Sequence, residues 1–269
     1  MLKNIHKILK IITGITLFIF IAIIAFKAII YNITFPYKLH FNINREQFKE
    51  FSYQIKTQEN INVIYSNKNS KDLILYMHGN MGRLQYILDY FKDHNISFIS
   101  PAYPGYQGSS GKPSVQNIYE TSSSILAEIE KLFGTNINIH VIGHSLGSQA
   151  AFYLAHKYAP KIKTISIIAG FDSIKNLCKD TLKLLGLICE LEDNNFNNLK
   201  LSQKKLDTIF YSFHKKDDKI ISYKRGKNLF NNVKANEKYF IELTNGDHAF
   251  FDLDYVTNII LNKAPANKK

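Results

Sequence analysis

After about residue 60, short apolar runs alternate along the chain with longer stretches of helical periodicity. The apolar runs have the length of buried strands and lie at residues 72–76, 137–142, 206–213 and 238–243. Residues 115–133 show the helical pattern, with one apolar face made of Ile118, Ile125, Leu126, Ile129 and Leu132. Strands that alternate with amphipathic helices predict an α/β fold with a doubly wound, mostly parallel sheet.

The N-terminal region has a different pattern. Residues 11–26 contain no charge, and apolar residues resume at 28–30, beyond Lys27. From residue 8 to residue 31 the segment is long enough to span roughly 30 Å of hydrocarbon. Lys3, Lys7 and Lys10 precede the uncharged run 11–26, which favours a cytoplasmic N-terminus. We therefore expect residues 1–40 to hold a cytoplasmic stub and a single transmembrane signal-anchor helix, with the rest of the chain outside the cytoplasm. A cleaved signal peptide is the alternative.

The sequence Gly-His-Ser-Leu-Gly at 143–147 lies between the apolar run 137–142 and helix-forming residues 149–158. Strand, G-x-S-x-G and helix in this order predict a nucleophile elbow. The serine sits in a strained turn, and the two glycines let neighbouring backbone approach closely. Ser145 is the candidate nucleophile, and the backbone N–H of Leu146 is a candidate donor to an oxyanion. His144, the variable position, is expected to shape the site rather than react.

A serine hydroxyl is a weak nucleophile unless a base takes its proton. Two residues suited to this task follow later predicted strands: Asp218 comes after 206–213, and His248 after 238–243. Their chain order, serine then acid then histidine, is the order of an α/β-type triad. His248 would accept the serine proton, and Asp218 would orient the imidazole. Asp217 is the alternative acid.

A further loop follows the run at 72–76 and reads Met-His-Gly-Asn-Met-Gly at 77–82. A His-Gly step at this place supplies a backbone donor for an oxyanion hole, and we assign it to the N–H of Asn80. His78 precedes Ser145 in the chain, so we expect its ring to hydrogen-bond locally and shape the loop.

These stretches together resemble the α/β-hydrolases, and among them the hydrolase-domain proteins that carry an N-terminal membrane anchor. The resemblance rests on residues 73–82, 98–114, 140–151 and 214–226 and on the Gly-Asp-His step at 246–248. It implies an α/β-hydrolase fold. It also implies an acid four residues after the histidine that opens the 214–226 loop, which favours Asp218 over Asp217.

In this organisation the α/β-hydrolase domain covers residues 41–269, and residues 171–205 form a short lid over Ser145. The leucines and isoleucines of the lid favour an apolar substrate group beside the nucleophile. Cys178 and Cys189 both lie in this segment. They could pair in an oxidising compartment or remain two buried thiols, and the sequence leaves both possibilities open.

The whole chain has a net charge of +12, and part of this charge belongs to the N-terminal segment. Residues 1–40 hold five lysines and no acid, so 29 basic residues remain against 22 acidic ones. Arginine occurs three times, a poor composition for bidentate recognition of phosphates or bases. We expect no nucleic-acid partner, and a basic surface suits a nearby anionic bilayer. The histidines have no metal-ligand spacing with Cys, Asp or Glu, so we expect no metal and no cofactor.

The sequence predicts a membrane-anchored serine hydrolase that cleaves an ester or thioester through an acyl-enzyme. A small acyl ester, a thioester or a lipid-like molecule would be the substrate. Two alternatives remain open: a catalytically silent binding protein at the membrane, and an aminopeptidase-like peptidase, which would need an acidic subsite for the substrate amine. A serine at position 145 argues against dehalogenases and epoxide hydrolases, which carry an aspartate there.

Overall fold

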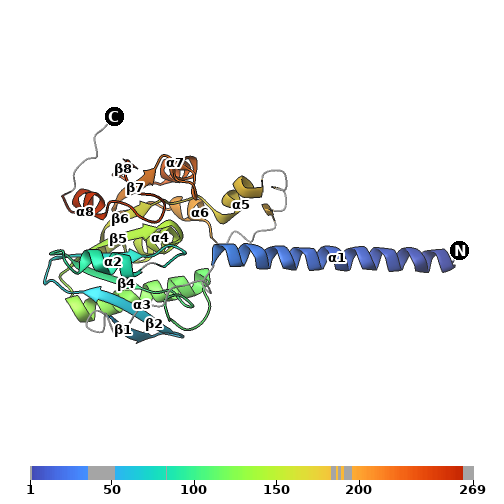
Figure 1. Cartoon of the computed structure of the whole chain (residues 1–269), viewed down its shortest axis with the longest axis horizontal. Coiled ribbons are helices and arrows are strands. Elements are labelled where there is room, and N and C mark those ends of the chain that lie inside the picture. The colour runs from blue at the N-terminus through green and yellow to red at the C-terminus, as the bar shows by residue number, and fades with distance from the viewer. Residues whose placement is uncertain are drawn as a thin grey trace.

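The computed structural model describes residues 2–35, 52–82, 84–182, 186, 189–190 and 196–262. An eight-stranded sheet forms its centre, in the order β1-β2-β4-β3-β5-β6-β7-β8 (Figure 1). β2 pairs antiparallel with both β1 and β4, and all other neighbouring strands are parallel. The strands are β1 (Ser52–Lys56), β2 (Asn60–Ser66), β3 (Asp72–Met77), β4 (Ser97–Pro101), β5 (Asn138–His144), β6 (Ile162–Ile168), β7 (Ile209–Lys215) and β8 (Lys238–Leu243).

Helices cover both faces of this sheet. Those of the body are α2 (Leu84–Phe91), α3 (Val115–Phe133), α4 (Ser148–Lys157), α5 (Ile174–Leu182), α6 (Asn198–Ser202), α7 (Tyr223–Asn232) and α8 (Leu253–Asn262). Buried residues of α3, α4 and α7 belong to one hydrophobic cluster, and those of α2 and α8 to another. The predicted doubly wound, mostly parallel α/β fold is confirmed.

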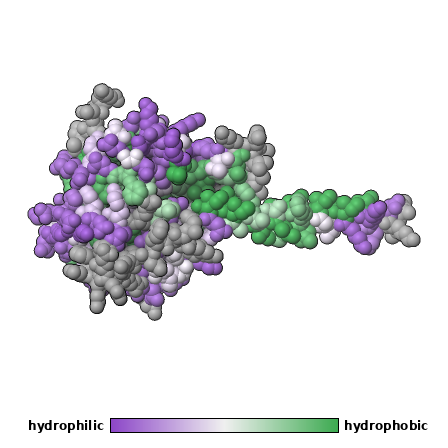
Figure 2. All heavy atoms as spheres, in the orientation of Figure 1, coloured by the Kyte–Doolittle hydropathy of each residue, from purple (hydrophilic) through white to green (hydrophobic). Residues whose placement is uncertain are grey.

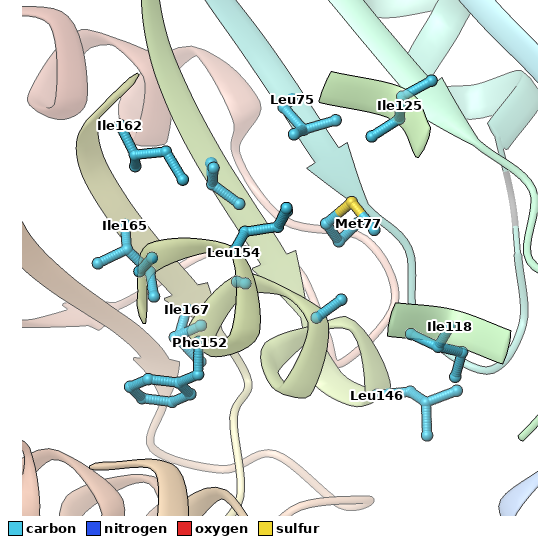
Figure 3. Packing of buried hydrophobic residues seen from close by; sticks show 14 of the residues in the cluster. Leu75, Met77, Ile118, Ile125, Leu146, Phe152, Leu154, Ile162, Ile165 and Ile167 are labelled. Atoms are coloured by element: carbon cyan, nitrogen blue, oxygen red, sulfur yellow. The ribbon is translucent and has the colours of Figure 1, made fainter. Parts of the chain in front are cut away.

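The alternation of side chains along β3 shows how one strand serves both clusters. Leu75 and Met77 point into the cluster that contains α3 and α4, whereas Ile74 and Tyr76 point into the cluster of α2 and α8. Figure 3 shows the first cluster, where β3 and β6 meet α3 and α4. Because both faces are covered, the central strands read as continuous apolar runs rather than as alternating ones.

The predicted elements around the site are present with small shifts. Residues 115–133 form α3, and residues 238–243 form β8, as expected. The strand expected at 206–213 begins later, at Ile209, and runs to Lys215. Leu206 instead makes an isolated parallel bridge with Ala235, because its amide donates to the carbonyl of Lys234.

Helix α1 (Leu2–Thr34) projects from the body (Figure 1). Among the described residues it is the one helix long and apolar enough to cross a membrane, over Asn4–Thr34. Figure 2 shows its hydrophobic surface and the polar atoms near its free end. The expected boundary between residues 40 and 41 lies outside the described residues.

The C-terminal end of α1 is attached to the body. The Tyr31 hydroxyl donates a hydrogen bond of 2.9 Å to the carbonyl oxygen of Pro113. Phe35, just after the helix, is buried, and its ring centroid lies 6.4 Å from that of Phe196. The last turns of α1 therefore pack against the sheet domain.

Candidate active site

Ser145 stands at a sharp turn between β5 and α4. Its φ of 49° lies in the left-handed region, which costs a non-glycine residue roughly 1–2 kcal/mol. The flanking glycines make this turn possible. A Cβ at Gly147 would overlap the carbonyl oxygen of Met77, and one at Gly143 would lie 2.6 Å from the carbonyl oxygen of Gly147. The predicted strand, turn and helix are present, with Ser145 at the strained position.

His248 lies within hydrogen-bond reach of Ser145. Its Nε2 is 3.2 Å from Ser145 Oγ, and its Nδ1 is 2.8 Å from Asp218 Oδ2. An ionised carboxylate can only accept, so Nδ1 carries the proton and the neutral Nε2 is free to accept from the serine hydroxyl. The structure thus brings together the three residues that the sequence placed in three separate loops.

The Asp218 carboxylate is held from two sides. Oδ2 meets His248, and Oδ1 accepts from the amides of Ile220 and Ile221 at 2.8 and 2.9 Å. Burial raises the pKa of Asp218, but these hydrogen bonds and the imidazole outweigh it and keep the pKa below its ordinary value. Asp217, the alternative acid, is exposed and pairs instead with Lys215 at 2.8 Å.

A second histidine, His214, holds the loop that carries Asp218. His214 is fully buried, and its Nε2–H donates to the carbonyl oxygen of Ile221 at 2.9 Å. Burial lowers the pKa of His214 and keeps its ring neutral. A Cβ at Gly226 would overlap this ring, so a glycine is required where α7 crosses it. His214 therefore fixes the loop that carries the candidate acid, Asp218.

His144 positions the loop that carries the candidate base, His248. It is buried, and its Nε2–H donates to the backbone carbonyl oxygen of His248 at 2.7 Å. Burial lowers the pKa of His144 to about 3, with a further contribution from the neighbouring His248 ring. A neutral His144 is thus a fixed donor that ties β5 to the His248 loop, in agreement with the expected shaping role.

The loop after β3 approaches Ser145 closely. A Cβ at Gly79 would lie 3.2 Å from the His144 ring and 3.4 Å from Ser145 Cβ. The ring of His78 holds this loop locally: Nδ1–H donates to the carbonyl oxygen of Gly79, and Nε2 accepts from the amide of Tyr103. Asn80 and Leu146, the expected oxyanion donors, both line the cavity at Ser145.

The turn at Ser145 is also connected to residues 171–205, the predicted lid. Ser148 Oγ donates to the carbonyl oxygen of Ser145 at 2.6 Å and accepts from Asn198 Nδ2 at 2.7 Å. The same Asn198 amide donates to the carbonyl oxygen of Phe171. The buried side chain of Asn198 therefore joins Phe171, at the start of the predicted lid, to the strained turn at Ser145.

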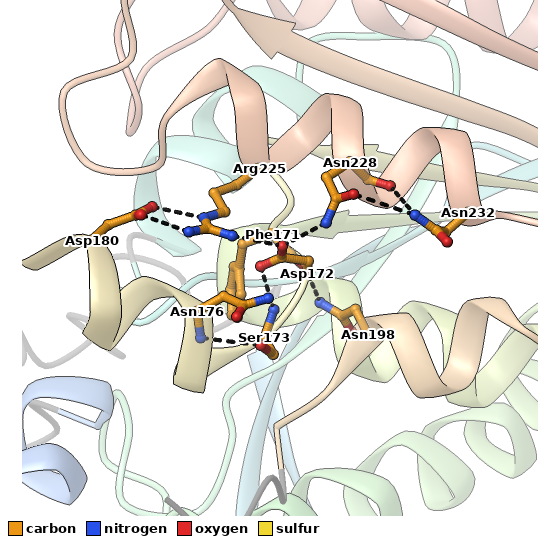
Figure 4. A network of polar contacts seen from close by, with 9 residues as sticks. All are labelled: Phe171, Asp172, Ser173, Asn176, Asp180, Asn198, Arg225, Asn228 and Asn232. Carbon is orange, nitrogen blue, oxygen red and sulfur yellow. Dashed lines mark hydrogen bonds and ion pairs between the residues drawn. The ribbon is translucent and has the colours of Figure 1, made fainter. Parts of the chain in front are cut away.

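Figure 4 shows a polar network that joins the predicted lid to α7. Asp172 is fully buried, and its Oδ2 accepts from Arg225 Nη1 at 3.0 Å and from Asn228 Nδ2 at 2.8 Å. The same guanidinium makes a bidentate contact with Asp180 of α5. Arg225 thus bridges the start of the lid and its helix. No sequence motif marks this bridge, and the one signal for it is that Arg225 is one of only three arginines.

The predicted lid also contains a disulfide. Cys178 and Cys189 are bonded, with their Cα atoms 5.8 Å apart. The bond packs in a small hydrophobic cluster with Ile30 of α1, and Phe26, Ile174 and Leu182 lie against it. Of the two possibilities left open by the sequence, the structure contains the disulfide.

An apolar cavity of about 660 Å³ ends at Ser145. Asn80, Leu146, Asp218 and His248 surround the serine at its inner end, while α5 and α1 form its outer walls. On the other side of Ser145 lies a recess of only about 20 Å³. The large cavity can hold a drug-sized ligand, whereas the recess has room for about one water molecule.

No family model matches the sequence. Alpha/beta hydrolase domain-containing protein 10 from mouse has a similar structure, with a TM-score of 0.57 and 15% identity over 79% of this chain and 96% of its own. An esterase from Pyrococcus furiosus has a TM-score of 0.59 and 12% identity over 78% and 87%. A lipase-esterase related protein from Clostridium acetobutylicum has a TM-score of 0.55 and 15% identity over 75% and 94%. At such identities the likeness shows a shared fold.

Proposed function

From the α/β-hydrolase fold of this chain, we propose that the protein is a membrane-anchored serine hydrolase that cleaves an ester or thioester. Ser145 is the nucleophile, His248 the base, and Asp218 the acid that orients it. The observation that carries the proposal is the continuous line of contacts from Ser145 Oγ through the imidazole to the carboxylate, at 3.2 and 2.8 Å. Such a line activates a hydroxyl for acyl transfer.

In the first half of the reaction, Ser145 Oγ bonds to the substrate carbonyl carbon as its proton passes to His248 Nε2. The backbone N–H groups of Asn80 and Leu146 stabilise the carbonyl oxygen as it becomes an oxyanion. When this intermediate collapses, the bond to the leaving group breaks. His248 returns its proton to the leaving alcohol or thiol, and an acyl-enzyme remains on Ser145.

Water completes the cycle. His248 takes a proton from a water molecule, whose oxygen attacks the acyl carbon. The bond to Ser145 Oγ then breaks, and the serine oxygen recovers the proton from His248. The products are a carboxylic acid and the free enzyme. No step requires a metal or a cofactor.

The placement at a membrane rests on α1 and on the disulfide. An apolar helix of this length serves as a single-pass anchor, and the lysines before it favour a cytoplasmic N-terminus. That orientation puts the hydrolase domain outside the cytoplasm. The Cys178–Cys189 bond supports this side of the membrane, because disulfides persist in oxidising compartments.

The aminopeptidase alternative needs a free acidic group near Ser145. Asp180 lines the cavity, but both of its carboxylate oxygens accept from Arg225. Those hydrogen bonds lower the pKa of Asp180 and occupy the charge that a substrate amine would require. The described lining of the cavity therefore favours an ester or thioester over a peptide with a free amino terminus.

Labelling of the full-length protein with an alkyl fluorophosphonate tests the proposal. Ser145 Oγ would bond to phosphorus as fluoride leaves, and peptide mass spectrometry would find the adduct on Ser145. Hydrolysis of p-nitrophenyl esters and acyl thioesters then measures the activity. A protein that neither reacts with the probe nor turns over any of these substrates would be the silent binding protein.

A further inference from the structure

We propose that the end of the membrane helix α1 is one wall of the substrate site, and that the substrate is an ester held in the bilayer. Its acyl chain lies between α1 and α5, with the ester carbonyl at Ser145. This inference rests on the proposed serine hydrolase activity and adds the source of the substrate and the element that binds its chain.

Four apolar side chains of α1 line the cavity that ends at Ser145: Phe26, Ile29, Ile30 and Ile33. Their spacing of three and four residues places them on one face of the helix. We call this face the anchor wall. It extends over seven helical steps, about 10 Å at 1.5 Å per residue. The cavity is therefore incomplete without the anchor.

Helix α5 supplies the facing wall. Its apolar lining consists of Ile174, Leu177, Cys178 and Leu182, which we call the lid wall. The two walls meet where Ile30 packs on the disulfide. Figure 2 shows hydrophobic surface that continues from α1 onto the adjoining part of the body. A chain-like apolar group fits between these walls.

The residues of the anchor wall differ in how far they are covered. Ile30 is 9% exposed, whereas Ile29 and Ile33 are 56% and 65% exposed even though both line the cavity. The cavity thus opens along α1 rather than away from it. Beside a helix that crosses the membrane, such an opening would lie at the level of the lipid headgroups.

The length of α1 sets the depth of this opening. The candidate span of 31 residues is about 46 Å long, against about 30 Å of hydrocarbon. Its interior charges, Lys10 and Lys27, are about 26 Å apart along the axis. Lys27 would therefore lie near the outer boundary of the hydrocarbon. The anchor wall begins beside it, at the level where lipid ester groups reside.

The polarity of the cavity matches such a ligand. The walls along α1 and α5 are mostly apolar, with Thr34, Asp180 and Thr181 as their polar members, while Asp218 and His248 lie beside Ser145. The small recess on the other side of Ser145 has no room for a chain. Of these two spaces beside Ser145, the one between the anchor wall and the lid wall can hold the long acyl chain of such a substrate.

Photo-crosslinking tests this inference on the full-length protein in phosphatidylcholine vesicles. The probe is a long-chain alkyl fluorophosphonate with a diazirine at the chain end. After the probe has reacted with Ser145, illumination is expected to crosslink its tail to peptides that contain residues 26–34 or 174–182. A tail attached only to other segments would overturn the inference and leave the serine hydrolase proposal intact. Absence of the adduct at Ser145 would instead overturn the proposed function, and this inference with it.

A substitution in the anchor wall provides an independent test. In Ile33→Trp the larger side chain narrows the site, so the ratio of kcat/KM for a p-nitrophenyl palmitate in vesicles to that for p-nitrophenyl acetate should fall by at least about tenfold. Ala28→Trp is the matched control, because Ala28 is exposed on the side of α1 away from the cavity. An unchanged ratio in Ile33→Trp, or an equal fall in Ala28→Trp, would contradict the assigned wall.

Discussion

The Nε2–H of His144 donates to the backbone carbonyl oxygen of His248 at 2.7 Å, so the residue before Ser145 holds the loop that carries the proposed base. His144→Phe removes this donor and leaves the carbonyl unpaired. One lost hydrogen bond is worth about 0.5–1.5 kcal/mol, which corresponds to a fall in kcat of roughly two- to tenfold. His144→Gln keeps a donor and should retain more activity in the same ester assay. Equal activities of the two variants would contradict the positioning role.

The same residue makes stability depend on pH. The pKa of His144 is about 3 in the folded chain and 6.5 as a free side chain. Between these values the unfolded chain binds a proton that the folded one does not, so stability falls as the pH drops below 6.5. The loss approaches about 1.4 kcal/mol per pH unit from this group.

Thermal melts followed by circular dichroism at pH 7.5 and pH 5 check this dependence. The wild type should lose melting temperature at pH 5, and His144→Gln should lose less because it lacks the titrating ring. His214, whose pKa is also lowered by burial, retains its own contribution in both proteins. The same loss in wild type and variant would show that His144 is not the source.

Substitutions at two adjacent aspartates distinguish the proposed acid, Asp218, from its neighbour, Asp217. Asp218→Asn keeps the shape of the side chain but favours the wrong imidazole tautomer, so kcat should fall by about 10⁴. Asp217→Asn is the matched control, because Asp217 is exposed and pairs with Lys215. Its kcat should stay near that of the wild type. If Asp217→Asn is the more damaging change, the assignment of the acid is wrong.

Much of the site could be predicted because each part follows a strand with a short, recognisable loop. Ser145, Asp218 and His248 lie at the ends of β5, β7 and β8, and parallel strands bring such loops to one edge of the sheet. The spacing of four residues from His214 favoured Asp218 over Asp217, and Asp218 is the aspartate that contacts the His248 ring. The catalytic roles of these residues remain predictions.

The anchor wall could not be predicted in the same way. Residues 11–26 are apolar all around the helix, and such a pattern does not say which face meets protein and which meets lipid. The disulfide was equally undetermined, because two cysteines in an apolar segment fit buried thiols as well. The link from Asp172 through Arg225 to Asp180 joins residues 53 and 45 positions apart, and no local pattern encodes it.

That link predicts a stability effect. Asp172→Asn removes the buried charge that faces Arg225, and a hydrogen bond to a charged group contributes about 1.5–3 kcal/mol. For a domain of this size, the melting temperature should fall by roughly 2–4 °C per kcal/mol. Asp180→Asn, on the more exposed side of the same guanidinium, should cost less than about 1 kcal/mol. A larger effect from Asp180→Asn would contradict the central place of Asp172.

The disulfide predicts that Cys178 and Cys189 are oxidised in the native protein. When membranes that contain the full-length protein are alkylated without a reductant, mass spectrometry should find a peptide linked through Cys178 and Cys189. Both thiols should become reactive after reduction. Alkylation of both cysteines before reduction would contradict the bond and remove its support for an extracytoplasmic domain.

The most direct test of the account is the turnover of Ser145→Ala. The strain of the turn resides in the backbone and the side chain is small, so the variant should keep the wild-type circular dichroism spectrum. Loss of a triad nucleophile lowers kcat on the order of 10⁶, and hydrolysis of a p-nitrophenyl ester should fall to background. Ser124→Ala on α3, where the hydroxyl donates to the backbone carbonyl oxygen of Glu120, is the control and should keep full activity. A folded Ser145→Ala that retains even a tenth of the wild-type turnover would contradict the assignment of Ser145 as the nucleophile.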